Sequence, residues 1–154
     1  MKKPPKLALL TKRTLTLEAA KQIASVAEKF ARKQDWNVVI AIVDDGGHLI
    51  YLARMDGTQI GSIEVAQAKA RTARAFKRPT KTWSEGLKAG RTQILGLPGA
   101  TPIEGGLPLV LKGEYLGAIG VSGAPPGKSE IESIDGACAQ SGMERIKDEI
   151  EFGE

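Results

Sequence analysis

The chain has 154 residues, of which 42% are hydrophobic and 26% are charged, as expected for one compact domain. A single His and a single Cys exclude a His-rich zinc site, an iron–sulfur cluster held by this chain alone and an internal disulfide. The formal net charge of +4 comes from five basic residues within the first thirteen positions. The rest of the chain is nearly neutral, so the charge predicts no nucleic-acid partner.

Residues 1–13 are predicted to form a basic flexible tail in front of a single domain at 14–150. The apolar run from Leu7 to Leu10 is shorter than the apolar core of a secretory signal, which takes about 7 to 15 residues. No apolar run approaches the roughly 18 residues that predict a membrane-spanning helix. We therefore expect a cytoplasmic protein without a membrane partner.

The first predicted elements are a helix and a hairpin. Apolar residues recur with helical spacing over 17–34, where Thr16 is a suitable N-cap. The continuously apolar, β-branched run 38–43 predicts a central strand covered on both faces. The turn 44–47 has two glycines and joins this strand to a second one over 48–55.

Two helices and a long loop are predicted next. The first helix runs over 62–78 because Pro79 forbids its continuation, and its alanines would let another element approach closely. A short helix begins near Thr82 with capping-box spacing and ends before Gly90. Residues 95–106 contain four glycines and two prolines, so we predict a long ordered loop, a type of segment that is often functional.

The chain ends with a second predicted hairpin, 107–111 and 115–122, and a final helix over about 131–146. The resulting order is α-ββ-α-α-ββ-α. Hairpins interleaved with helices predict an α+β fold, in which a mainly antiparallel sheet of four to five strands is flanked by helices.

A segment that imitates a phosphate-binding loop lies between the last predicted strand and the last helix. Residues 123–129 end in Gly-Lys-Ser, but the first glycine of the motif is replaced by Ser122. Pro125 and Pro126 also remove backbone N–H groups that would bind phosphate. We interpret the segment as an exposed turn, and we expect the glycines of the preceding strand to allow close approach of another backbone.

Three charged residues are candidates for ligand binding. Arg54 ends a strand beside a tight turn, Lys69 lies in an otherwise apolar helix stripe, and His48 follows the Gly-Gly turn. With Asp56, Arg54 and Lys69 would form either a structural ion-pair network or a clamp for a ligand carboxylate. His48 has either a structural role or the role of an axial ligand to haem iron.

A second group of candidates lies in turns and loops. Glu104, next to Gly105 and Gly106 at the end of the long loop, can supply a general base or a metal ligand to the cleft in which Arg54 and Lys69 would bind a ligand. Asp44 is the other candidate base. Cys138 falls on the apolar positions of the last helix, which indicates a buried and unreactive thiol.

Six short segments, taken in order, carry a family resemblance: 42–49, 54–57, 69–73, 105–108, 117–123 and 137–139. Spread over about 15–146, they resemble the motifs of the GlcG/HbpS-like family of haem-binding and haem-degrading proteins. The C-terminal domain of PduO-type adenosyltransferases is similar. The resemblance implies a profilin-like sandwich and a homo-oligomer, whereas a shared fold alone does not transfer a function.

Together, the residues and the resemblance predict a small-molecule binding protein whose ligand is haem or a small carboxylated metabolite. The expected cleft lies between the 44–48 turn, the helix that carries Lys69, and the loop of Glu104, Gly105 and Gly106. Arg54 and Lys69 would bind ligand carboxylates, and His48 would bind iron if the ligand is haem; no other metal site is expected. One alternative is an isomerase or lyase that acts on a small carboxylated metabolite with Glu104 or Asp44 as base. Another is a purely structural oligomerisation module.

Overall fold

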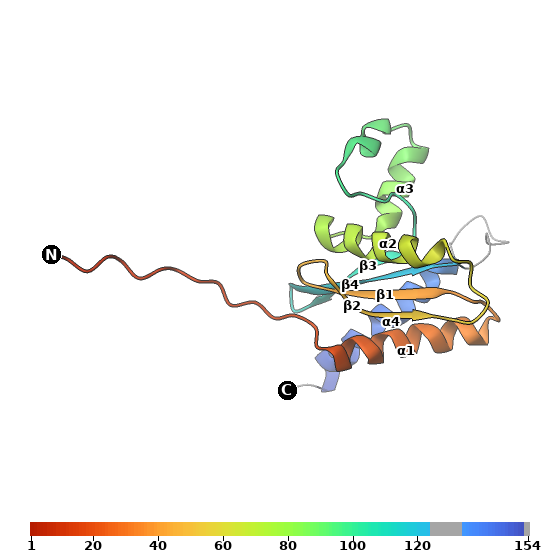
Figure 1. Cartoon of the computed structure of the whole chain (residues 1–154), viewed down its shortest axis with the longest axis horizontal. Coiled ribbons are helices and arrows are strands. Elements are labelled where there is room, and N and C mark those ends of the chain that lie inside the picture. Colours follow the sequence, from red (N-terminus) through yellow and green to blue (C-terminus); the bar gives the residue numbers. More distant parts are fainter. Residues whose placement is uncertain (124–133, 153–154) are drawn as a thin grey trace.

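A four-stranded antiparallel sheet is the middle layer of the computed structural model, which describes residues 1–123 and 134–152 (Figure 1). The strands are β1 (Val39–Asp44), β2 (Leu49–Arg54), β3 (Gly106–Leu111) and β4 (Glu114–Ser122). They lie in the order β2-β1-β4-β3, so both predicted hairpins are present and their inner strands pair with each other. The predicted α+β fold is confirmed.

Helices cover both faces of this sheet. α1 (Leu17–Lys33) and α4 (Ile134–Phe152) pack on one face, and α2 (Ser62–Phe76) packs on the other. α3 (Thr80–Lys88) and the short 3₁₀ helix η1 (Thr92–Gly96) extend beyond α2, away from the sheet (Figure 1). The predicted order of elements is confirmed, with η1 as an addition inside the long loop.

Strand β1 is buried on both faces, which explains its continuous apolar sequence. Ile40 and Ile42 belong to the large core that α1 and α4 build with the sheet. Val39, Ala41 and Val43 face the other way, against small alanines of α2. All five side chains are at most 1% exposed.

A glycine of the sheet permits α2 to lie directly on β4. A Cβ atom at Gly120 would overlap the carbonyl oxygen of Ala66 and would lie 2.6 Å from the backbone nitrogen of Ala70. Real Cβ atoms do not approach other atoms this closely, so only glycine fits. The expected close approach of another backbone is therefore present, and it places α2 over the centre of the sheet.

Several boundaries differ from the expectations. α2 ends at Phe76 because Lys77 adopts a left-handed conformation with φ of 54°, and α3 already begins at Thr80. α2 begins at Ser62, as expected, and this serine is fully buried. The turn predicted at 123–129 and the predicted start of the last helix near 131 fall largely on residues 124–133, which lie outside the described part of the chain. No helix among the described residues has the length and apolar character needed to span a bilayer.

Candidate functional site

A buried ion pair joins α2, α4 and the end of β4. The Nζ atom of Lys69 lies 3.0 Å from Oδ2 of Asp135 and donates a hydrogen bond of 2.9 Å to the carbonyl oxygen of Val121. The Lys69 side chain is 2% exposed and the Asp135 side chain is 16% exposed. Charges taken out of water need such partners, because an unpaired buried charge is strongly destabilising.

The loop before β3 passes directly over this ion pair, and two glycines make room for it. Gly105 has φ of 129°, and a Cβ atom there would lie 2.9 Å from Nζ of Lys69 and 3.1 Å from Cβ of Asp135. A Cβ atom at Gly106 would overlap the backbone carbonyl of Lys69. The Gly-Gly sequence is therefore required by the packing of the loop on Lys69, whatever else the loop does.

A cavity of about 500 Å³ opens on the outer side of the same loop, between the loop, the start of α3 and α4. Its polar side chains are Lys81, Glu104, Gln140, Ser141 and Glu144, and its apolar part includes Phe30, Pro79, Leu107 and Ala137. We call this the Glu104 cavity. Its wall combines one cation, two carboxylates and neutral polar groups with an apolar remainder, which is the usual character of a small-molecule site.

Two contacts position the carboxylate of Glu104. Oε1 lies 4.0 Å from Nζ of Lys81, in a pair whose side chains are 24% and 43% exposed. The carboxylate also packs on the backbone of α4, because a Cβ atom at Gly136 would lie 2.6 Å from Oε1. Gly136 therefore allows Glu104 to lie flat on α4. The long and partly exposed Lys81 contact is weak enough for a ligand to replace it.

The structure brings together four of the residues singled out in the sequence. Glu104, Gly105 and Gly106 line the cavity, and Lys69 lies directly beneath the two glycines without reaching the cavity wall. Lys69 is thus positioned to fix the loop rather than to touch a ligand.

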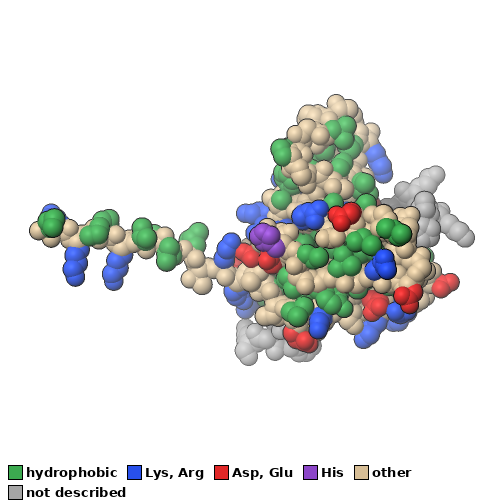
Figure 2. Space-filling view, viewed as in Figure 1, with side chains coloured by type: hydrophobic (Ala, Val, Ile, Leu, Met, Phe, Trp, Pro, Cys, Tyr) green, Lys and Arg blue, Asp and Glu red, His purple; other side chains and the backbone are tan. Residues whose placement is uncertain are grey.

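The 44–48 turn is not part of this site. Asp44 pairs with Gly117 along the sheet, whereas the ion pair of Lys69 lies at Val121, four residues further along β4. At the rise of a strand this separation is about 13 Å. The His48 side chain is 83% exposed, and Figure 2 shows it on the surface near the base of the extended N-terminal segment. The single cleft expected from the sequence is therefore not formed within one chain.

Asp44 and Arg54 lie outside the cavity. The Asp44 carboxylate accepts hydrogen bonds of 2.9 Å from the backbone N–H groups of both Gly46 and His48, which closes the turn. Arg54 is exposed at the end of the edge strand β2. The alternative network of Arg54, Asp56 and Lys69 is not formed, because the carboxylate that pairs with Lys69 is that of Asp135.

The Glu104 cavity does not offer the ligands of an enclosed haem iron. Axial ligands of haem iron are commonly His, Cys, Met or Tyr, and none of these residue types lines the Glu104 cavity. The His48 side chain is exposed to solvent and does not line that cavity. Cys138 is fully buried, and burial raises the pKa of its thiol to about 12, so it is not available as a thiolate. Among the described residues there is also no cluster of three or more His, Cys, Asp or Glu side chains that could hold a metal ion.

Sequence reasoning missed the residues that complete this region. Asp135, Lys81, Gln140 and Ser141 were not among the candidates, although Lys81 precedes the predicted short helix and Asp135 lies within the predicted last helix. One usable signal was Lys69 itself, because a lysine on an apolar helix stripe requires an acidic partner. Spacing alone does not reveal which of the distant carboxylates that partner is.

Comparisons with known proteins agree with this fold. The family model described as haem degrading protein HbpS-like matches residues 15–144. Protein GlcG of Escherichia coli K12 is 42% identical over 112 residues, which are 73% of this chain and 84% of that protein. A double mutant of Streptomyces reticuli HbpS matches with a TM-score of 0.79 at 32% identity, over 95% of this chain and 99% of the other. A PduOC–haem complex matches with a TM-score of 0.71 at 26% identity, over 84% and 93% of the two chains.

Proposed function

The chain belongs to the HbpS-like family, and we propose that it binds a small hydroxylated carboxylate in the Glu104 cavity. The observation that supports this most directly is the cavity itself, whose volume of about 500 Å³ falls within the range of small-ligand sites, roughly 300–1,000 Å³. Family membership supports small-molecule binding in general terms, and the chemistry of the cavity wall narrows the ligand class.

The charges of the cavity favour a ligand that both accepts and donates hydrogen bonds. Lys81 is the cation that a ligand carboxylate would meet, in place of its 4.0 Å contact with Glu104. Glu104 and Glu144 are acceptors when ionised, so they favour hydroxyl groups on the ligand and disfavour further negative charge. A short hydroxy acid satisfies both requirements.

Titrations with related small molecules test the ligand class. We expect lactate to shift the backbone amide NMR signals of Gly105 and Gly106, and we expect weaker effects from propionate, which lacks the hydroxyl, and from lactamide, which lacks the charge. Lys81→Met should weaken lactate binding about tenfold or more, because a hydrogen bond to a charged group contributes about 1.5–3 kcal/mol. Lys88→Met, on the exposed end of the same helix, is the matched control and should bind as the natural chain does. Equal binding of all three compounds, or equal loss in both variants, would contradict the proposal.

An enzymatic role is the second candidate, and the shared location of Glu104 and Lys81 favours it. A carboxylate beside a bound hydroxy acid can remove the proton from the ligand carbon that carries the carboxylate. Lys81 would stabilise the negative charge that then develops on the ligand. Such a step belongs to an isomerase or a lyase, and Asp44 is not proposed as base because its carboxylate holds the turn. Exchange of the lactate Cα proton in deuterated water, lost in Glu104→Gln while binding persists, is the expected result. Absence of exchange in the natural chain would refute the enzymatic role and leave ligand binding as the one proposed function.

Haem binding is proposed only through His48. The PduOC neighbour is a haem complex, and His48 is the single imidazole of this chain. Adding hemin should then shift the Soret band, and His48→Ala should abolish that shift. No shift, or the same shift in the variant, would exclude His48 as an iron ligand. The cytoplasmic location and the homo-oligomer expected from the sequence also remain proposals.

A further inference from the structure

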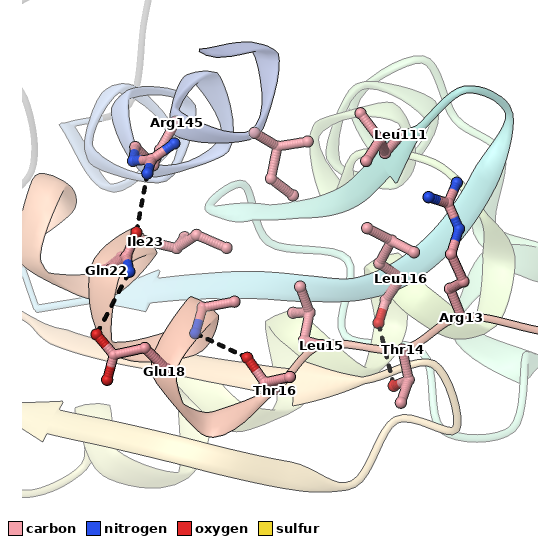
Figure 3. A pocket seen from close by; sticks show the side chains of 12 residues that line it. Arg13, Thr14, Leu15, Thr16, Glu18, Gln22, Ile23, Leu111, Leu116 and Arg145 are labelled. Atoms are coloured by element: carbon pink, nitrogen blue, oxygen red, sulfur yellow. Dashed lines mark hydrogen bonds between the residues drawn. The ribbon is translucent and has the colours of Figure 1, made fainter. Parts of the chain in front are cut away.

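A second hollow lies at the end of the sheet and shares no lining residue with the Glu104 cavity. It measures about 370 Å³ and is bounded by the start of α1, the β3–β4 hairpin and α4. Figure 3 shows Ile23, Leu111 and Leu116 pointing into this space, with Arg13 and Arg145 at opposite sides of it. We call it the N-terminal groove. Its interior includes these apolar side chains and is open to solvent, and no apolar group from the described part of the chain fills it.

The N-terminal segment, residues 1–11, has the complementary character. Every residue in it is exposed, and Figure 1 shows the segment extended away from the body of the molecule. Leu7, Leu9 and Leu10 are 87%, 85% and 98% exposed. We call this segment the arm. Burial of such exposed leucine side chains against a partner is favourable, and groups of exposed apolar side chains are typical of interaction surfaces.

Two ion pairs connect the base of the arm to the body of the molecule. Lys12 Nζ lies 2.8 Å from Oδ2 of Asp45, and Arg13 Nε lies 3.1 Å from Oε2 of Glu114. These contacts hold the arm against the tips of both hairpins, and the lysine and the arginine lower the pKa of Asp45 and of Glu114 respectively. Next to them, the Thr14 hydroxyl accepts a hydrogen bond from the Asp45 N–H at 3.2 Å. The arm therefore starts at the rim of the groove and leads outward.

We propose that the N-terminal groove receives Leu7, Leu9 and Leu10 from the arm of a second copy of this chain. Arm and groove are present on every chain and lie next to each other at the arm's base. With a two-fold axis beside the groove, the arm of each copy would therefore bind in the groove of the other copy. Such an exchange is complete in a dimer and needs no third copy. An extended chain spans about 3.3 Å per residue, so Leu7 lies up to about 20 Å beyond Arg13, within reach of a neighbouring molecule.

The contacts at the base of the arm favour a second copy over the arm's own groove. Leu10 is two residues before Lys12, and Arg13 is itself part of the groove wall. For the arm to enter its own groove, the chain would have to reverse at Thr11 and Lys12, which would pull Lys12 away from Asp45. Exchange between two copies keeps the contacts at the base and the extended backbone. The inference gives a specific contact to the proposed homo-oligomer and does not depend on the Glu104 cavity.

The mass of the full chain in solution is the first test. We expect sedimentation velocity to show a dimer or a larger even-numbered assembly, and we expect the triple variant Leu7→Ser/Leu9→Ser/Leu10→Ser to have half that mass or less. Leu95→Ser, which changes a leucine that is 70% exposed on η1, is the matched control and should keep the natural mass. A monomeric natural chain, or a triple variant of unchanged mass, would overturn the inference. If the triple variant keeps the natural mass, the chain still forms a homo-oligomer, but through another interface.

A disulfide test locates the arm. The natural Cys138 is buried, so an introduced pair of cysteines reports without interference. Leu9→Cys and Ala19→Cys, made in separate chains and mixed under mild oxidation, should give a cross-linked dimer, because Ala19 lines the groove. Ala75→Cys, at an exposed position of α2, should not cross-link to Leu9→Cys. Cross-linking within a single chain that carries both Leu9→Cys and Ala19→Cys, or equal cross-linking to Ala75→Cys, would overturn the inference. Binding of a monomeric chain to vesicles of phosphatidylserine would likewise overturn it, because the arm would then serve a membrane.

Discussion

Replacing Lys69 by Met tests whether the buried ion pair stabilises the fold. Met keeps a straight side chain of similar length but removes the ammonium, so Asp135 loses its 3.0 Å ion pair and the carbonyl of Val121 loses the 2.9 Å hydrogen bond that it accepts. Removing one partner of a buried ion pair costs about 3–5 kcal/mol. Because the Asp135 side chain is 16% exposed and water can solvate it in part, we expect the lower end, about 3 kcal/mol.

Urea unfolding at a fixed protein concentration measures this loss, since an assembly would otherwise shift the apparent stability. For a chain of this length, about 3 kcal/mol corresponds to a fall of roughly 6–12 °C in Tm. Lys21→Met, at an exposed position of α1, is the matched control and should change the free energy of unfolding by no more than about 0.5 kcal/mol.

A double-mutant cycle separates the ion pair from general damage. Asp135→Ala alone leaves the ammonium of Lys69 buried, with the Val121 carbonyl as its remaining partner among the described residues, so we expect it to be at least as destabilising as Lys69→Met. The combined variant has neither buried charge and should cost less than the sum of the two single changes, by about 1–3 kcal/mol. Additive effects, or a loss below about 1 kcal/mol for Lys69→Met, would refute the reasoning.

Three further predictions concern packing, thiol reactivity and pH. Gly120→Ala should destabilise the fold by about 3 kcal/mol or more in urea unfolding because its Cβ would meet the backbone of α2, whereas Gly61→Ala, with open space and φ of −57°, should be neutral or slightly stabilising. Cys138 should not react with a thiol reagent such as DTNB at pH 8 while the chain is folded, because its pKa is raised to about 12, and it should react fully in guanidinium; rapid reaction of the native chain would contradict its burial. The pKa values of Asp45 and Glu114 are lowered, so their ion pairs stabilise the folded chain at pH values above the ordinary carboxyl pKa. This stabilisation is lost as the pH falls through the lowered pKa values. NMR relaxation should therefore show the base of the arm held from neutral pH down to about pH 4 and released below it, and release near pH 6 would be the wrong result.

The arrangement of helices and strands follows from local patterns in the sequence. The continuous apolar run of β1 predicted a strand buried on both faces, and both hairpins begin where glycines allow tight turns. These features depend on residues within a few positions of one another, so periodicity and turn chemistry are sufficient to predict them.

The site depends on contacts that are distant in the sequence. Lys69 and Asp135 are separated by 66 positions, and their pairing results from the way α2 and α4 each meet the end of β4. The expected cleft with His48 failed for the same reason, since the antiparallel register of β1 and β4 puts the turn and the ion pair at different ends of the sheet. Local spacing contains no information about register between strands that lie about 80 positions apart.

The strand order also has a consequence for synthesis of the chain. β1 lies between β2, its neighbour along the chain, and β4, which is complete only at Ser122. As the chain leaves the ribosome, the first hairpin exists while one edge of its most apolar strand still lacks a partner. Unpaired apolar edges favour aggregation, so we expect nascent chains that stop before β4 to need chaperones, and full-length chains to become independent of them once β4 has paired.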